Sequence, residues 1–209
     1  MLASGSVARS RLLSQVGISH KVMISGVHEE SFGENDPKGL VQKLALAKAI
    51  AVSERLVKAE NNNFWPNEIT SILGCDSVFE FRGETFGKPA DGKEAAKRLQ
   101  MISGETGTLH TGHAFLKENF LIKDNHERIR EEEKLVDVVS TRVNFADISK
   151  SEIDDYVATG EPLGCAGAFS LEGKSGLFIS SLEGCYSNVI GLSLPWLRGA
   201  MYSFTGNNL

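Results

Sequence analysis

The sequence predicts an α/β or α+β fold in which helices flank a mixed, twisted central sheet. Helical and strand-like runs alternate along the chain, and neither an internal repeat nor a low-complexity tract interrupts them. Strand-like runs that lie far apart in the sequence must pair with one another, which favours a mixed sheet. With 209 residues, 41% of them hydrophobic, the chain can bury a full core as one domain or as two closely joined lobes.

The first third of the chain predicts two helices and a strand. A helix is expected from Arg9 to Val16, because Gly17 is a natural stop, and a strand from His20 to Ser25. The run from Gly39 to about Lys58 has a helical period and no breaker, so it predicts a long helix. A polar loop is expected over residues 59–67.

The middle of the chain predicts hairpins around a second helix. Two short strands, Ser71 to Cys75 and Ser77 to Phe81, precede a turn at residues 82–84. An amphipathic helix is expected from Asp91 to Ile102, closed by Ser103 and Gly104. Further strands are expected at 108–116 and 135–145, and the charged segment from Asn125 to Lys134 is typical of a solvated hairpin tip.

The clearest local signal lies after Ile148. Ser149 and Glu152 form a capping-box pattern, Ile148 and Ile153 stand at the positions of a hydrophobic staple, and Gly160 is placed to end the helix. Strands are then expected near residues 177–180 and 186–190, and a closing helix from about Leu194.

Composition limits the function. A net charge of −5, from 22 basic and 27 acidic residues, does not favour a nucleic acid partner, and a small phosphorylated ligand fits better. No stretch approaches the ~20 apolar residues that span a bilayer, and the N-terminus has no signal-peptide pattern, so a cytoplasmic protein without a membrane partner is expected. Cys75, Cys165 and Cys185 lie far apart, which indicates reduced thiols and no structural zinc.

The N-terminal turn has two interpretations. In Ser4-Gly5-Ser6, the glycine lets a ligand approach the backbone, while the serines and the following helix offer hydroxyl and amide donors to a phosphate. Arg9 adds a cation. The alternative is an ordinary turn in which Ser6 is the N-cap of the helix.

Three charged residues stand out elsewhere. Lys48 falls inside the apolar arc of the long helix, so it either reaches the rim of the core or meets an anion. Asp76 interrupts an apolar strand, which indicates a strand end or bulge and a metal ligand or catalytic base; it could instead bond its own turn amides. Lys88 would be carried toward Asp76 if the strand at Val78 pairs with that around Thr85.

Together these residues resemble the Maf family of nucleoside triphosphate pyrophosphatases, whose fold is related to that of the inosine triphosphate pyrophosphatases. The resemblance covers nearly the whole chain and rests on motifs in a fixed order: Leu2-Ala3-Ser4-Gly5-Ser6 with Arg9, Val27-His28-Glu29, Leu44-Ala45-Leu46-Ala47-Lys48-Ala49, Gly74-Cys75-Asp76-Ser77, Gly87-Lys88-Pro89, Ser103-Gly104, Thr111-Gly112, residues 156–163, Ala166-Gly167-Ala168-Phe169 and Gly191-Leu192.

The resemblance implies a single Maf-like domain over residues 1–209, formed by two lobes with the active-site cleft between them. It also implies that the α–β phosphoanhydride of a nucleotide is split to a nucleoside monophosphate and pyrophosphate, with a divalent cation, Mg²⁺ or Mn²⁺. A homodimer is the family expectation. By resemblance, the catalytic residues are Asp76, Glu29 and Lys48, with Glu29 and Asp76 as metal ligands; the substrate-binding residues are Ser4, Ser6, Arg9, Lys88, Ser77 and Glu172.

The chain also departs from the family pattern. The family usually has Ser-Pro-Arg-Arg where this chain has Ser6-Val7-Ala8-Arg9, so one arginine is missing, and Arg11 could substitute only if the helix begins late. Cys165-Ala166-Gly167 and Glu172 are similar to the members that act on 7-methyl-GTP, because a carboxylate accepts the N–H donors of a guanine edge. The segment from Cys185 to Gly191 is closer to the members that act on dTTP and UTP. A nucleotide-binding regulator of cell division is the non-enzymatic alternative.

Overall fold

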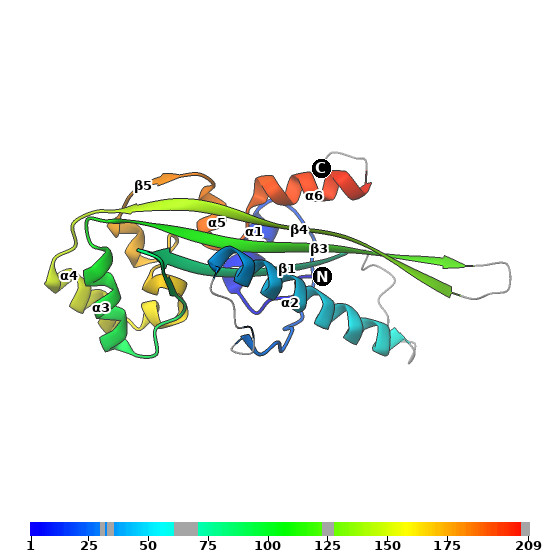
Figure 1. Ribbon diagram of the computed structural model, residues 1–209, viewed down its shortest axis with the longest axis horizontal. Helices are drawn as coiled ribbons and strands as arrows, with labels where there is room; N and C mark the ends of the chain where they lie inside the picture. Colours follow the sequence, from blue (N-terminus) through cyan, green and yellow to red (C-terminus); the bar gives the residue numbers. More distant parts are fainter. Residues whose placement is uncertain (30–31, 33–35, 61–70, 123–127, 206–209) are drawn as a thin grey trace. The chain divides into compact units, whose positions relative to one another are not determined.

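The structure is a computed structural model that describes residues 1–29, 32, 36–60, 71–122 and 128–205. Helices and strands alternate along the chain (Figure 1), and each label below is that of the figure. In chain order, the elements are α1 (Val7–Gln15), α2 (Pro37–Glu60), β1 (Ser71–Phe81), β2 (Glu84–Phe86), α3 (Gly92–Ile102), β3 (Thr106–Ile122), β4 (Arg128–Phe145), α4 (Lys150–Ala158), the short 3₁₀ helices η2 (Glu161–Gly164), η3 (Ala166–Ala168) and η4 (Lys174–Phe178), β5 (Ile179–Glu183), α5 (Tyr186–Ile190) and α6 (Leu194–Thr205).

The five strands form one sheet in the order β2-β1-β3-β4-β5. β1 and β2 are antiparallel, with Phe79 opposite Phe86, and β4 and β5 are antiparallel, with Val143 opposite Leu182. Outside the named strands, Leu2 forms isolated parallel bridges with Val22 and Leu73. The mixed α/β architecture expected from the sequence is therefore confirmed.

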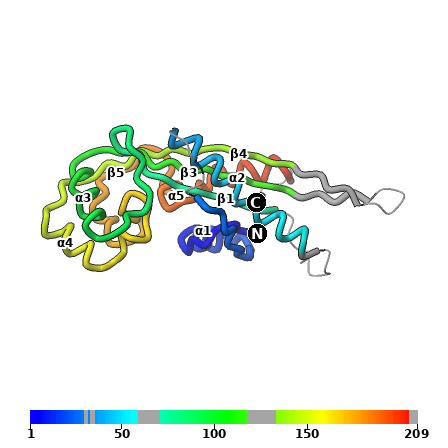
Figure 2. The backbone as a smooth tube through the Cα atoms, turned by 60° about the horizontal axis from the view of Figure 1, so that its bottom comes forward, coloured from blue at the N-terminus to red at the C-terminus, as the bar shows by residue number. Residues whose placement is uncertain are grey.

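The chain divides into two compact units. Unit 1 comprises residues 1–76, 112–138 and 194–209, and unit 2 comprises residues 77–111 and 139–193. Each has a hydrophobic core of its own: small side chains of α2 pack on Ile72 and Leu116 in unit 1, whereas aromatic residues around Phe79 fill unit 2. Figure 2 shows α3 and α4 beside each other in unit 2. Whether an active-site cleft lies between two lobes stays a prediction.

Glycines let α2 lie very close to the sheet of unit 1. A Cβ added at Gly74 of β1 would lie 2.2 Å from the carbonyl oxygen of Ala45, and one added at Gly112 of β3 would lie 2.0 Å from that of Val41. Both carbonyls belong to the α2 backbone, which cannot give way as a flexible side chain could. The missing side chains therefore set the position of α2 and of every residue it carries.

We expect Gly74→Ala to lower the free energy of unfolding by about 1–3 kcal/mol, because the new methyl group overpacks a backbone contact. Thermal or urea denaturation followed by circular dichroism measures the effect. The control is Gly199→Ala in α6, where an added Cβ meets nothing within 4 Å. That change should be neutral or slightly stabilising, since alanine favours a helix. Equal stability of Gly74→Ala and the wild type would contradict the close approach.

Several predicted elements are confirmed with small changes of boundary. α1 begins two residues earlier than expected, at Val7, α2 is longer at both ends, and α3 begins after its N-cap Asp91. The capping box of α4 is present, with Ser149 accepting from the amide of Glu152 and the carboxylate of Glu152 accepting from the amide of Ser149. The hairpin turn lies at residues 82–83, as expected, and most of the predicted loop at 59–67 lies outside the described residues.

Two predictions of secondary structure are wrong. The segment from His20 to Ser25 is no strand, because only Val22 bridges to Leu2. Residues 186–190 form the short helix α5, which begins after Cys185 and ends at Gly191 with a φ of 120°. Two β-branched residues suggested a strand there, but the tertiary contacts of Asn188 hold a helical turn.

The charged segment from Asn125 to Lys134 is also different from the prediction. Residues from Arg128 onward belong to β4, so most of the segment is strand rather than a solvated tip, and residues 123–127 lie outside the described part. Charged residues are compatible with a strand whose side chains are solvated, as the exposed Glu133 and Lys134 are. Within the described residues, no helix is long and apolar enough to cross a lipid bilayer.

Candidate active site

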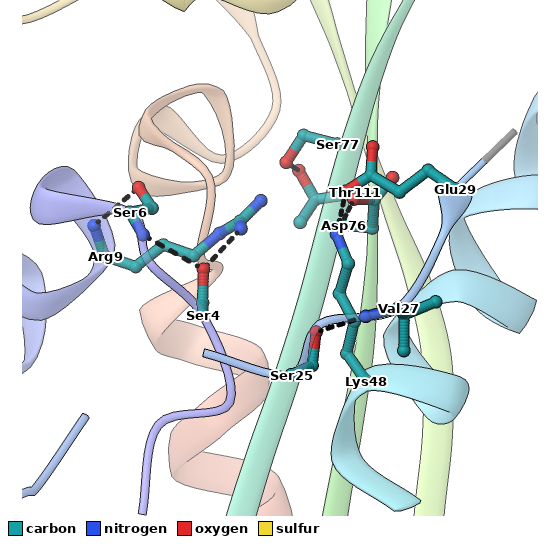
Figure 3. A network of polar contacts seen from close by, with 10 residues as sticks. All are labelled: Ser4, Ser6, Arg9, Ser25, Val27, Glu29, Lys48, Asp76, Ser77 and Thr111. Carbon is teal, nitrogen blue, oxygen red and sulfur yellow. Dashed lines mark hydrogen bonds and ion pairs between the residues drawn. The ribbon is translucent and has the colours of Figure 1, made fainter. Parts of the chain in front are cut away.

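Lys48 holds two carboxylates at one point in unit 1. Its Nζ donates to Glu29 Oε1 at 2.7 Å and to Asp76 Oδ1 at 2.5 Å (Figure 3). The Lys48 and Asp76 side chains are only 10% and 12% exposed, whereas that of Glu29 is 59% exposed. The lysine predicted to lie on the apolar face of its helix is therefore buried and meets anions, rather than reaching the rim of the core.

Asp76 lies within β1, and not at a strand end or bulge as the sequence suggested. The strand runs without interruption from Ser71 to Phe81, and Asp76 is buried. A carboxylate can occupy such a position because Lys48, 28 residues earlier in the chain, supplies an opposite charge and a hydrogen bond. The alternative in which Asp76 bonds its own turn amides is wrong, since the residue is not in a turn.

The pKa of Asp76 is raised above its ordinary value. Burial is the largest cause, and the repulsion of Glu29 acts in the same direction, while the charges of Lys48 and Arg9 oppose it. A carboxylate with a raised pKa is a stronger base once it is ionised. The neighbouring Cys75 is fully buried, and burial raises the pKa of its thiol to about 11, which leaves it protonated at neutral pH.

The N-terminal turn confirms that Ser6 is the N-cap of α1, and its contacts are also compatible with a phosphate bound at the turn. Ser6 Oγ accepts from the amide of Arg9, and the amide of Ser6 donates to Ser4 Oγ at 3.2 Å. Arg9 Nη1 donates to the same Ser4 oxygen at 3.0 Å, and Arg9 is buried (Figure 3). Because α1 begins early, at Val7, the condition under which Arg11 would replace the missing arginine is not met, and Arg11 is exposed.

The backbone before Glu29 is fastened to α2 by Arg55. The guanidinium donates to the carbonyl of Ile24 at 2.7 Å and also to the carbonyl of Ser25. Ser25 Oγ in turn accepts from the amide of Val27 (Figure 3). α2 thus carries Lys48, which contacts the Glu29 carboxylate, and Arg55, which holds the segment that leads to it.

The carboxylates of Glu29 and Asp76 fit a hard divalent cation. Mg²⁺ is bound in proteins through one or two carboxylates, with water and substrate phosphate oxygens as its other ligands. Among the described residues, no three His, Cys, Asp or Glu side chains gather at one point. Among the described residues, Glu29 and Asp76 would therefore be the ligands of a cation at this site. Water or substrate would supply its other oxygen ligands.

The remaining predicted site residues, Ser77, Lys88 and Glu172, belong to unit 2, so their part in this site stays a prediction. Lys88 is exposed and lies just after the end of β2. β2 pairs with β1, with Phe86 opposite Phe79, so the strand pairing on which the predicted position of Lys88 depended is present. Glu172 is exposed. Ser77 Oγ lies 3.0 Å from Thr111 Oγ1 (Figure 3).

α3 holds the loop that carries Lys88. Arg98 Nη1 donates to the carbonyl of Gly87 at 2.7 Å, its guanidinium lies over the Phe86 ring, and Glu94 Oε2 accepts from the amide of Ala90 at 2.7 Å. Sequence reasoning missed Arg98, and the only signal was its spacing of four from Glu94 on a predicted helix. The contacts of Thr111 with Ser77 in β1 and with the carbonyl of Asn188 in α5 join segments that are far apart in the sequence.

Comparisons with known proteins find similarity over nearly the whole chain. A family model described as "Maf-like protein" matches residues 1–204. A protein of Parasynechococcus marenigrum (strain WH8102) named "Nucleoside triphosphate pyrophosphatase" is 51% identical over 201 residues, which cover 96% of this chain and 93% of the relative. A protein of the same name from Prochlorococcus marinus (strain MIT 9313) is 52% identical over 198 residues, which cover 95% of this chain and 96% of the relative.

Proposed function

The chain belongs to the Maf family, and on that premise we propose that it hydrolyses the α–β phosphoanhydride of a nucleoside triphosphate, with 7-methyl-GTP preferred. Its curated relatives bear the name of a nucleoside triphosphate pyrophosphatase, so it is an enzyme of the hydrolase class that acts on phosphoanhydrides. The products of the proposed reaction are a nucleoside monophosphate and pyrophosphate.

The observation that carries the proposal is the pair of carboxylates, Glu29 and Asp76, held by Lys48 at 2.7 and 2.5 Å. In this proposal, Asp76 accepts a proton from the attacking water, and its raised pKa makes it suited to that task. Lys48 orients both carboxylates and would balance charge on a phosphate oxygen. No covalent intermediate is needed, because positioning and electrostatic stabilisation suffice for phosphoryl transfer.

A divalent cation, Mg²⁺ or Mn²⁺, is part of the proposal. Glu29 and Asp76 would hold it, and it would lower the pKa of a bound water and balance charge on the phosphates. Arg9 and Ser6 would bind the triphosphate, and the guanidinium offers a planar fork of donors. The amide of Ser6 donates to Ser4 Oγ and Ser6 Oγ accepts from the amide of Arg9, so the donor that Ser6 would offer to a phosphate is its hydroxyl hydrogen.

The preference for 7-methyl-GTP rests on Glu172, which is exposed in unit 2. A carboxylate is only an acceptor, so it suits the N1–H and N2–H donors of guanine and the positive charge of the methylated ring. Uracil and thymine present both a donor and acceptors, and a lone carboxylate pairs with only part of that edge.

The test is pyrophosphate release with Mg²⁺ or Mn²⁺ over a panel of 7-methyl-GTP, GTP, dTTP and UTP. We expect the highest kcat/KM for 7-methyl-GTP, and we expect Glu172→Gln to reduce the ratio of its kcat/KM to that for UTP. A wild-type protein that prefers dTTP or UTP would overturn the preference while leaving the reaction intact. Absence of pyrophosphate from every nucleotide would overturn the reaction itself.

A further inference from the structure

Three polar side chains on neighbouring strands of unit 2 are joined by hydrogen bonds. His110 of β3 lies in the middle: its Nε2 is 2.8 Å from Glu80 Oε2 of β1, and its Nδ1 is 2.7 Å from Ser140 Oγ of β4. The strands β1, β3 and β4 are consecutive in the sheet (Figure 1). A carboxylate, a histidine and a serine therefore form one continuous row across the sheet.

This row lies on the face of the sheet opposite the aromatic core of unit 2. Phe79 and Leu109, which precede two members of the row, belong to that core. Because successive side chains of a strand point to opposite faces, Glu80 and His110 point the other way. The side chain of His110 is only 3% exposed and that of Glu80 is 35% exposed, whereas Ser140 is exposed. The imidazole is thus held in place, while the hydroxyl is accessible.

The carboxylate sets the direction of the hydrogen bonds. An ionised carboxylate only accepts, so the hydrogen in the contact with Glu80 is carried by His110 Nε2. In the neutral ring, Nδ1 then carries no hydrogen, and the hydroxyl of Ser140 donates to it. The nitrogen that faces Ser140 is thus a base within hydrogen-bond distance of the proton that a nucleophilic serine must lose.

A second contact between a serine and a histidine shows what the carboxylate adds. In unit 1, Ser10 Oγ lies 2.7 Å from His20 Nε2, and His20 Nδ1 donates to the carbonyl of Ile18 at 3.0 Å. A serine that gives its proton to such a ring creates a positively charged imidazolium. The carboxylate of Glu80 balances that charge in unit 2, whereas a carbonyl offers only its dipole. Ser140 should therefore be the more nucleophilic of the two serines.

We infer that Ser140 is an activated nucleophile that accepts an acyl group from a carboxylic ester, with His110 as its base and Glu80 as a positioning residue. This activity is separate from pyrophosphate release. Covalent catalysis requires a nucleophile, a base within hydrogen-bond reach and a third group that orients the base. Such a triad is recognised by geometry and not by order in the chain, and here the two ring nitrogens exchange the roles that they have in serine proteases.

The row supplies every proton transfer that the step needs. Ser140 Oγ forms a bond to the carbonyl carbon of the ester, and its proton passes to His110 Nδ1. The bond from that carbon to the leaving oxygen then breaks, and the imidazolium gives the proton to the departing alcohol. Water attacks the resulting ester of Ser140 with the same base, which releases the carboxylic acid and restores the hydroxyl.

The experiment combines two readouts on the full chain. Hydrolysis of p-nitrophenyl acetate gives kcat and KM, and a fluorophosphonate, whose phosphorus bonds to an activated serine as fluoride leaves, is located by mass spectrometry of peptides. We expect the wild type to hydrolyse the ester and to carry the phosphonyl group on Ser140. Ser140→Ala and His110→Gln should each abolish this label and lower kcat about 10²-fold or more, the range of a positioned general base.

Two further variants separate the triad from a general effect on the surface. Glu80→Gln keeps an acceptor for the ring hydrogen but removes the charge, so it should lower kcat about 10-fold or more while KM and the melting temperature stay unchanged. Ser181→Ala is the matched control, since Ser181 is also exposed in unit 2 and its hydroxyl accepts from the side-chain amide of Asn144. It should hydrolyse the ester at the wild-type rate.

A wild-type protein that neither hydrolyses the ester nor takes up the phosphonyl group would overturn the inference. So would a label found on Ser10 in place of Ser140, or a Ser140→Ala variant as active as the wild type. Because Ser140 is exposed, its replacement by alanine should fold even if His110→Gln does not, and that variant alone then decides the outcome.

Discussion

Replacement of Asp76 by Asn should lower kcat for pyrophosphate release by about 10²- to 10⁴-fold, the range attributed to a positioned general base. Asn has nearly the same shape, and Lys48 Nζ can still donate to its side-chain oxygen, so the local structure should persist. Arg9 and Lys48, the cationic side chains proposed to bind the substrate, are unchanged, so Kd for the nucleotide measured without metal should stay within a few fold. Quenched assays of pyrophosphate together with calorimetry give both values.

The matched control is Asp155→Asn, which makes the same chemical change on the exposed surface of α4 and should leave kcat as it is. Retained binding without turnover supports catalysis at Asp76. If Asp76→Asn keeps full turnover, another group must act as the base. If the wild type binds nucleotides and never hydrolyses them, the non-enzymatic regulator of cell division becomes the better account of this chain.

Replacement of Lys48 by Met should lower the free energy of unfolding at neutral pH by about 3–5 kcal/mol, as expected when one partner of a buried ion pair is removed. Methionine fills similar volume, so the effect comes from Asp76, whose buried carboxylate would lose both its counter-charge and a hydrogen bond. Lys58→Met, at an exposed position of the same helix, should cost little. Urea denaturation of both variants measures the difference.

The pH dependence of Lys48→Met has a definite sign. Lys48 lowers the pKa of Asp76, so its removal raises that pKa further above the unfolded value. The native state then binds the proton more tightly than the unfolded chain, and the free energy of unfolding must rise as the pH falls through the native pKa. The loss of free energy of unfolding in Lys48→Met should therefore be greatest above that pKa and smaller in acid. A loss that is independent of pH would show that Asp76 is not its cause.

Local signals predicted the elements whose ends are set by nearby residues. Ser149 and Glu152 satisfy each other's backbone amides, so the start of α4 could be read from the sequence. The unusual chemistry of Lys48 and Asp76 was also visible, because a charge in an apolar pattern requires a partner. The sequence could not show that they are each other's partners, since that depends on how α2 lies against β1.

Predictions failed where distant contacts decide the structure. The run from Tyr186 to Ile190 has β-branched residues, but Asn188 bonds to two strands and keeps the segment helical. Asp76 suggested a break in the strand because an unpaired carboxylate is costly there, and Lys48 removes that cost. Arg98 was missed for the same reason, because it donates to the carbonyl of Gly87, which lies outside its own helix.

The contact of one ammonium with two carboxylates has a consequence for the energy of the proposed reaction. Glu29 and Asp76 repel each other, and a site that assembled them only when substrate arrived would have to overcome that repulsion in every turnover. Lys48 already holds them together in the folded protein, so the free energy of folding performs that work once. In the proposed reaction, the charges around the phosphate would then need little reorganisation, and this is the condition under which electrostatic catalysis is most effective.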